Sequence, residues 1–527
     1  MMLFAGALLI TLLSSGFTEF NTKGEPREAL VAHTMLSTGD WVLPVDEAGD
    51  MSYKPPMFHW LVAASSLLFG SLSEFTSRLP SALALSGLVT ATFCFFARRR
   101  EESSAKDTDT RQALLAALLT FTCFECFRAG TNCRVDMVLT FFMCTAIMAL
   151  VRGIERRSVL RLGLGALLLS GAALTKGPVG IVLPLGVVWV YALLQGRNFL
   201  KVTAVALIVL IAACLLPALW YYAAWRHGGD RFLSLAMEEN FGRFTGQMTY
   251  DSHVKPFWYN FVSLLTGTLP WSLLLICTLR PRRWRIKAPR LSWAKIRQAD
   301  PYTLLSVTAA VLIFIFYCIP KSKRSVYLLP MYPFIGYLLA KRFMALIRER
   351  RLSAKLMRRL VTIVLILYPI GYAIVFPFSV NGRSDRAIAE DISQIVPDKE
   401  PVYTFVPDAF LRYYVTNHYL GYRMKSLLPS GQTPGADRTP EANDIAAVPG
   451  DCFYLALSEK VWDGRQIPLS AEGGKETDFG IHSWLTSRGL EAEEIYRSER
   501  STRDVKGRLV LLKVASKTGT EKYDTNR

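Results

Sequence analysis

The segment 18–57 joins the first two apolar stretches of the chain and carries residue types that act in catalysis. Glu25 is a carboxylate that can take a proton from a hydroxyl group, and Arg27 is a cation that can bind an anion. Connections of about 40 residues are uncommon unless they have a function, and ionisable groups at membrane depth are functional candidates by default. We therefore predict that this segment forms half of an active site.

Glu25 also has a structural interpretation. Thr22 and Glu25 have the spacing of a capping box, which predicts a helix from about Lys23 to Ser37 with Pro26 tolerated in its first turn. A carboxylate at a helix N-terminus is held rigidly and stays ionised, and both properties suit a general base. Capping and catalysis are compatible, so both interpretations of Glu25 stay open.

Lys54 stands directly before Pro55 and Pro56. A proline restricts the preceding residue to extended conformations, which holds Lys54 outside the helix that follows. The lysine then points at a ligand, or it serves as an interfacial anchor together with Tyr53 and Trp60.

Asp136 opens an apolar stretch in the sequence Asn132-Cys133-Arg134-Val135-Asp136. It is either a catalytic acid or an ordinary N-terminal acidic residue paired with Arg134. Lys176 lies in Thr175-Lys176-Gly177-Pro178, where Gly-Pro ends one helix and begins the next. This pattern predicts a tight hairpin with Lys176 at its tip.

These side chains are positioned by many apolar elements. Runs long enough to cross a hydrocarbon core of roughly 30 Å predict about eleven membrane spans. They fall near 2–19, 79–97, 112–127, 136–151, 159–174, 178–194, 199–224, 257–279, 302–319, 326–343 and 360–379. The predicted fold class is a polytopic α-helical membrane protein with a small C-terminal α/β extracytoplasmic domain.

The placement of the cations argues against a nucleic-acid partner, although the net charge is +18. Arginines and lysines gather in alternate short loops, which is the positive-inside pattern and places 18–57 and the C-terminal segment outside the cytoplasm. The N-terminal stretch lacks a basic region and a cleavage signal, so we expect a retained helix. We predict a bacterial inner-membrane protein with a periplasmic active site.

The exception to the positive-inside pattern is an outward loop with Lys321, Lys323 and Arg324, followed by Tyr327. Cations on this side are explained if they bind an anion, and a lipid phosphate is the natural candidate. The alternative is a solvated face that contacts anionic headgroups.

Hydropathy falls after residue 380, which predicts a membrane domain over 1–380 and a soluble domain over 381–516. We expect a helix over 387–395 and a disordered tail over 517–527. The predicted strands cover residues 401–406, 452–456 and 508–514.

An ordered series of motifs resembles the GT-C class of membrane glycosyltransferases, in particular the ArnT, protein O-mannosyltransferase and RgtA/B/C/D-like group. The motifs are Glu25-Pro26-Arg27, Gly39-Asp40-Trp41, Lys54-Pro55-Pro56-Met57-Phe58-His59-Trp60, Ser77-Arg78-Leu79-Pro80, Asp136-Met137, Thr175-Lys176-Gly177-Pro178, Asn240-Phe241, Arg243-Phe244-Thr245-Gly246 and Lys321 to Pro333.

The resemblance implies transfer of a sugar from a polyprenyl-phosphate donor to an acceptor outside the cytoplasm. It implies catalytic roles for Glu25 and Asp136. The residues expected at the donor phosphate are Lys54, Arg243, Lys321, Lys323, Arg324 and Tyr327. The residues expected to contact substrate are Arg27, Tyr53, Trp60 and Lys176.

Two positions depart from the family pattern. Gly24 stands where an acid often precedes the first-loop carboxylate, so Glu25 would act alone. Tyr53 stands where some members have a glutamate associated with bound metal; we predict no metal ligands and no certain cofactor, and a divalent metal stays open. The sugar is also open, as is the acceptor, which can be lipid A, a glycan or a protein. The alternatives are a transporter or lipid flippase, and a non-catalytic scaffold.

Overall fold

The structure is a computed structural model of the 527-residue chain. It describes residues 1–20, 22, 24–45, 51–52, 54–97, 106–242, 254–278, 297–381, 385–404, 413–427, 450–464, 481–504 and 507–516. The predicted site residues Tyr53 and Arg243 and the predicted tail 517–527 lie outside the described residues.

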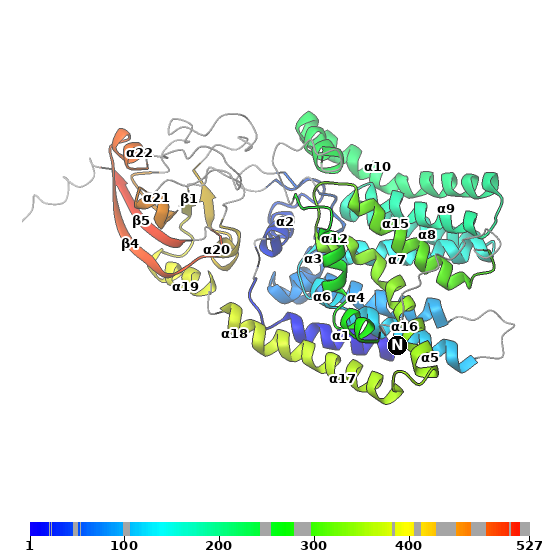
Figure 1. The fold of residues 1–527 in the computed structure, drawn as a ribbon. Helices are drawn as coiled ribbons and strands as arrows, with labels where there is room; N and C mark the ends of the chain where they lie inside the picture. Colours follow the sequence, from blue (N-terminus) through cyan, green and yellow to red (C-terminus); the bar gives the residue numbers. More distant parts are fainter. Residues whose placement is uncertain are drawn as a thin grey trace, which may run out of the picture. The chain divides into compact units, whose positions relative to one another are not determined.

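The chain divides into two compact units (Figure 1). The first, called the membrane unit, contains Met1–Phe17, Trp41–Leu43 and Tyr53–Ala373. The second, called the sheet unit, contains Thr18–Asp40, Pro44–Ser52 and Ile374–Arg527. Most of the first polar loop therefore belongs to the same unit as the C-terminal residues.

Helices form the membrane unit. They are α1 (Met2–Ser15), α3 (Met57–Phe69), α4 (Glu74–Ala97), α5 (Lys106–Thr122), α6 (Phe124–Gly130), α7 (Val135–Glu155), α8 (Val159–Lys176), α9 (Val179–Leu194), α10 (Phe199–Met237), α12 (Tyr259–Gly267), α13 (Trp271–Thr278), α15 (Pro301–Cys318), the 3₁₀-helix η2 (Ser325–Met331), α16 (Tyr332–Arg348) and α17 (Ala354–Ile370). The π-helical segments η1 (Glu238–Gly242) and η3 (Gly371–Val375) extend α10 and α17, and α18 (Phe376–Asn381), which follows η3, already belongs to the sheet unit.

Among the described residues, six helices are long and apolar enough to span a membrane, or up to eight if each of two bent pairs is one span. The bent pairs are α5 with α6 (66°) and α12 with α13 (95°). Shorter apolar helices cover Met2–Ser15, Met57–Phe69 and Val179–Leu194. The chain is thus an integral membrane protein, and the count of about eleven spans stays a prediction.

The outer surface of α10 shows why this unit requires lipid. Leu207, Ile208 and Ile211 are 53%, 67% and 65% exposed. Such a continuous apolar surface is unfavourable in water and suits the hydrocarbon core of a bilayer.

The sheet unit contains a five-stranded mixed sheet with strand order β2-β1-β3-β5-β4. Its elements are α2 (Gly24–Thr38), α19 (Asp385–Ile395), β1 (Val402–Thr404), α20 (Tyr414–Tyr419), β2 (Met424–Ser426), β3 (Cys452–Ser458), α21 (Glu459–Trp462), α22 (Ile481–Ser487), β4 (Leu490–Ser501) and β5 (Arg508–Ser516). β1 pairs in parallel with β2 and β3, whereas β5 is antiparallel to β3 and β4.

Both faces of the sheet are covered by apolar packing. Val510 and Leu512 of β5 belong to a cluster with Trp484 of α22, and Leu511 belongs to a cluster with Ile388 of α19. β1, β3, β5 and α19 confirm the three predicted strands and the predicted helix. Because β5 is buried on both sides, its sequence alternates only weakly between apolar and polar residues.

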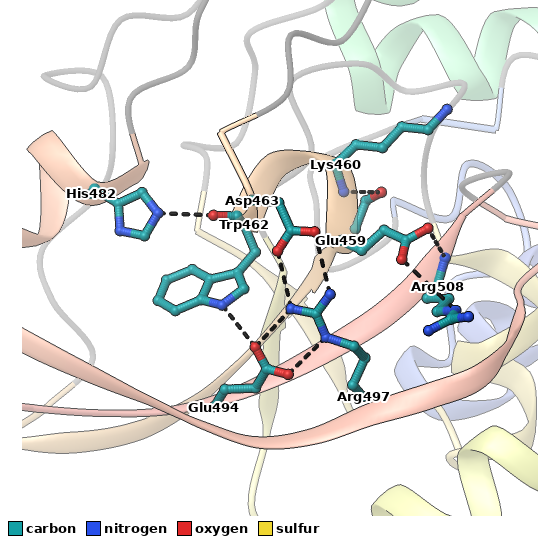
Figure 2. A network of polar contacts seen from close by, with 9 residues as sticks. Glu459, Lys460, Trp462, Asp463, His482, Glu494, Arg497 and Arg508 are labelled. Carbon is teal, nitrogen blue, oxygen red and sulfur yellow. Dashed lines mark hydrogen bonds and ion pairs between the residues drawn. The ribbon is translucent and has the colours of Figure 1, made fainter.

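A polar network fixes the short helix α21 to the edge strand β4 (Figure 2). Arg497 pairs with Glu494 at 2.7 Å and with Asp463 at 3.0 Å. The Trp462 indole N–H also donates to Glu494, at 2.9 Å, and His482 contacts the Trp462 carbonyl. The charged side chains along this exposed strand also discourage pairing with other chains.

Candidate active site

Asp136 lies in the first turn of α7 and is 3% exposed. Arg134, two residues before Asp136, has an extended backbone and is the last residue of the connection from α6. The Thr140 hydroxyl donates to the Asp136 carbonyl at 2.7 Å, one turn further along. An acidic residue is favoured at this end of a helix, where the unpaired N–H groups give a partial positive charge.

Lys176 is the last residue of α8, and its ammonium lies 2.6 Å from Asp136 Oδ1. Gly177 has φ +81°, a conformation that side-chain-bearing residues rarely adopt, and Pro178 caps α9. Gly180 lets α9 approach closely, because a Cβ there would lie 2.5 Å from the backbone of Ala172. The predicted hairpin between α8 and α9 is present, and its contact with Asp136 shows that Lys176 points toward α7.

Tyr327 on η2 completes the cluster, because its ring centroid lies 4.5 Å from the Lys176 ammonium. Its ring also packs against Tyr317 of α15 at 5.3 Å. Arg134 and Arg324 act electrostatically on the Asp136 carboxylate as well. A cation over an aromatic face is attracted by the ring quadrupole, so Tyr327 helps to hold Lys176.

The structure therefore brings together four of the predicted site residues from three elements of the membrane unit, namely α7, α8 and η2 with its N-terminal cap. They are Asp136, Lys176, Arg324 and Tyr327. We call these residues the Asp136 cluster. A buried carboxylate beside several cations and an aromatic ring can orient a hydroxyl group and bind a phosphate.

Lys323 is buried, and its ammonium donates to the Pro320 carbonyl at 2.6 Å and the Lys255 carbonyl at 3.5 Å. Val254 forms a β-bridge with Ser322 next to these contacts. Lys323 thus joins two loops through their backbones, which is a structural use of its donors. The adjacent Lys321 is exposed, and phosphate binding by both lysines stays a prediction.

Two tryptophans hold the short segment Trp41–Leu43 in the membrane unit. The Trp60 indole N–H of α3 donates to the Trp41 carbonyl at 2.8 Å, and the Trp220 indole N–H of α10 donates to the Val42 carbonyl at 3.0 Å. Two residues, Pro55 and Pro56, separate Lys54 from the start of α3. Since the Trp60 N–H is used in this way, only its ring is available to a substrate.

Glu25 and Arg27 lie on α2, in the sheet unit. The helix Gly24–Thr38 confirms the helix that the capping pattern predicts, and the Glu25 N–H donates to the Thr22 carbonyl at 3.2 Å. Glu25 is fully buried in the first turn, and Arg27 lies 3.9 Å from Glu28. That Glu25 and Asp136 face one cavity stays a prediction.

The sequence analysis missed one charged pair close to the Asp136 cluster. On α6, Arg128 donates to both carboxylate oxygens of the buried Glu125, at 3.1 and 2.6 Å. Arg128 also interacts electrostatically with Asp136. The signal was present as an acid and an arginine three residues apart within an apolar stretch.

A metal site has no support in the part of the chain that the structure describes. No group of three or more His, Cys, Asp or Glu side chains there is arranged to hold a metal ion.

Comparisons with known proteins find similar sequences among membrane sugar transferases. Residues 53–221 match the family described as dolichyl-phosphate-mannose-protein mannosyltransferase. The chain is 29% identical over 330 residues to the undecaprenyl phosphate-alpha-4-amino-4-deoxy-L-arabinose arabinosyl transferase of Aeromonas hydrophila, covering 62% of this chain and 56% of that relative. It is 30% identical over 314 residues to an uncharacterized protein of Aquifex aeolicus, covering 59% and 65%. The alignments thus span less than two thirds of these relatives.

Among solved structures, ArnT from Cupriavidus metallidurans bound to undecaprenyl phosphate matches with a TM-score of 0.68 at 20% identity, over 97% of both chains. Its apo state matches with a TM-score of 0.69 at 18% identity. The fold is therefore that of a polytopic GT-C membrane protein. The sequence matches are likewise to the ArnT and protein O-mannosyltransferase group, so the chain is similar to these membrane glycosyltransferases in sequence over residues 53–221 and in fold over nearly its whole length.

Proposed function

We propose that the protein transfers a sugar from a polyprenyl-phosphate donor to lipid A, a glycan or a protein on the extracytoplasmic side of the membrane. The Asp136 cluster is the observation that carries this proposal. It combines a buried carboxylate, cations and an aromatic ring at the end of a membrane helix. The names of the similar proteins support the donor class, since they include an undecaprenyl phosphate-alpha-4-amino-4-deoxy-L-arabinose arabinosyl transferase.

In the proposed reaction, the acceptor oxygen forms a bond to the anomeric carbon as the bond from that carbon to the phosphate oxygen breaks. The electron pair leaves with the phosphate, which gains negative charge, so preorganised cations such as Arg324 stabilise the transition state selectively. The acceptor proton passes to Glu25, the proposed general base. Because acceptor and phosphate approach opposite faces, we expect inversion at the sugar.

Asp136 and Lys176 have complementary roles in this scheme. Lys176 contacts Oδ1 of Asp136 and fixes the carboxylate, which leaves Oδ2 as the atom that we expect to orient the acceptor or the sugar. Lys176 itself can turn toward the leaving phosphate, because a flexible ammonium binds phosphate as a point charge.

The two ends of α7 support a periplasmic site in the bacterial inner membrane. Asp136 lies in the first turn and Arg152 in the last, about 24 Å apart at 1.5 Å per residue. Arg152 pairs with Glu155 and donates to the Phe95 carbonyl at the end that carries the topogenic cations. The positive-inside rule assigns that end to the cytoplasm and Asp136 to the opposite side.

The test compares lipid A, surface glycans and secreted proteins by mass spectrometry in cells with and without this chain. We expect a sugar modification that depends on the chain and that falls about 10²–10³-fold with Asp136→Asn or Glu25→Gln. Glu155→Gln is the matched control, an acid at the other end of the same helix. Near-normal modification in both site variants would remove the catalytic assignment. A change in lipid distribution without sugar transfer would favour a flippase.

A further inference from the structure

The sheet unit includes residues from both ends of the chain, and this arrangement suggests a role for the C-terminal residues. Thr18–Asp40, which contains α2 and Glu25, groups with Ile374–Arg527. We propose that the C-terminal domain is the platform that holds α2, and that Arg503, Tyr419 and Tyr422 are positioning residues for Glu25. This inference rests on the proposed function for the role of Glu25 and goes beyond it in assigning a task to the C-terminal domain.

The first attachment point is Phe20, five residues before Glu25. Its N–H donates to the Tyr419 hydroxyl at 3.0 Å, and its carbonyl accepts from Arg503 Nη1 at 2.7 Å. Its ring is fully buried and meets the His418 ring edge-on at 4.7 Å. The chain entering α2 is therefore held at the backbone on both sides of one residue.

The second attachment point is on α2 itself. The ring of His33 stacks on the ring of Tyr422, with centroids 3.8 Å apart and planes at 16°. The Tyr422 hydroxyl is in turn hydrogen-bonded to His418 Nδ1 at 2.8 Å. His33 lies about two helical turns after Glu25. A helix fixed before its start and again at its third turn presents Glu25 in one direction only.

The sheet determines where these attachment points lie. Arg503 and Asp504 occupy the connection between β4 and β5. Asp504 accepts hydrogen bonds from the N–H groups of Val415 and Thr416, so it fixes the start of α20, which carries Tyr419. The Arg503 N–H donates to Asp385 Oδ1 at 3.1 Å. One strand connection thus positions both contacts to Phe20.

This arrangement matters for catalysis because a general base must be placed accurately, and displacement by about 1 Å can cost 10²-fold in rate. A base carried on a loop alone would sample many orientations. A side chain supported by a folded domain is held more precisely.

The test uses the full chain and separates docking from catalysis. Hydrogen exchange read by mass spectrometry reports on Gly24–Thr38 without any substrate. We expect Arg503→Met to raise exchange in this peptide about tenfold or more. The matched control is Arg497→Met, which removes an arginine from the same hairpin whose partners are Glu494 and Asp463. It should leave exchange in α2 unchanged. Unchanged exchange of Gly24–Thr38 in Arg503→Met would contradict the proposal that the C-terminal domain holds α2.

The second measurement asks whether docking positions Glu25. Product per folded protein is measured in cells, and affinity for undecaprenyl phosphate is measured with the purified chain. We expect Arg503→Met to lower product about tenfold or more with unchanged lipid affinity, and Arg503→Lys to restore much of it. Raised exchange with normal product would overturn the positioning role. If even the wild-type chain yields no product, the proposed function fails, and exchange alone still decides whether the domain holds α2.

Discussion

Asp385 begins α19 in a setting that is unfavourable for a charged carboxylate. It is 1% exposed, and its Oδ2 makes no hydrogen bond within the described part of the chain, although Arg503 Nε lies 3.9 Å away. Burial, and after it the charge of Asp504, raise the pKa of Asp385 from 3.8 to about 7, although the N–H group and the charge of Arg503 act in the opposite direction. The carboxyl group is thus protonated in the folded state across a range where the unfolded chain has lost the proton.

The raised pKa of Asp385 makes the sheet unit less stable as the pH rises. Between pH 4 and pH 7 the folded state binds one proton more than the unfolded state, so the free energy of unfolding falls as the pH rises through this interval. One pKa unit corresponds to about 1.4 kcal/mol, so the full shift corresponds to about 4 kcal/mol above pH 7. An asparagine at position 385 can still accept the Arg503 N–H and carries no charge. Asp385→Asn should therefore stabilise the sheet unit most at high pH.

Hydrogen exchange in Arg508–Ser516 measures this without interference from the membrane unit. At each pH the variant is compared with the wild type, which cancels the intrinsic pH dependence of exchange. From pH 5 to pH 8, we expect the protection of Asp385→Asn relative to wild type to grow by up to about 3 kcal/mol, or about 100-fold. Asp391→Asn, an exposed acid on the same helix, should show no such growth. A constant difference between variant and wild type at all pH values would refute the reasoning.

Two further predictions concern the membrane unit and are read from thermal unfolding in detergent. Lys176→Met leaves Asp136 buried without its nearest cation and should lower the free energy of unfolding by about 3 kcal/mol. Adding Asp136→Asn to this variant should recover most of that loss. If the effects of the two substitutions on stability simply add, the two side chains do not interact directly. Gly180→Ala forces a Cβ to within 2.5 Å of the Ala172 backbone and should cost about 1–3 kcal/mol. Gly163→Ala adds its methyl group in open space and serves as the control, and equal stability of the two variants would argue against close helix packing.

The sequence predicts the Asp136 cluster well because each member stands at the end of an apolar stretch. Hydropathy and the positive-inside rule then assign those ends to one side of the membrane. Side-chain partners do not follow from such reasoning. Lys323 carries the expected charge but donates to two backbone carbonyls, and nothing in its local sequence distinguishes that use from phosphate binding.

In the sheet unit, sequence patterns failed to predict one strand and the grouping of α2 with the C-terminal residues. β4 was not predicted because its sequence, Leu490–Ser501, is rich in glutamate and contains register shifts. An edge strand can carry charges on its exposed face and be bulged, so the alternating pattern is lost. The grouping of α2 with the C-terminal residues depends on contacts such as Phe20 with Arg503, which are more than 400 residues apart, and no local pattern encodes them.

The division of the chain also bears on how the proposed reaction is controlled. Asp136 belongs to the membrane unit and Glu25 to the sheet unit. A reaction that requires both acids can proceed only when the two units present them to the same substrate. If Glu25 is the general base that we propose, the C-terminal domain contributes to the reaction through the placement of α2, even though its own side chains need not touch the sugar.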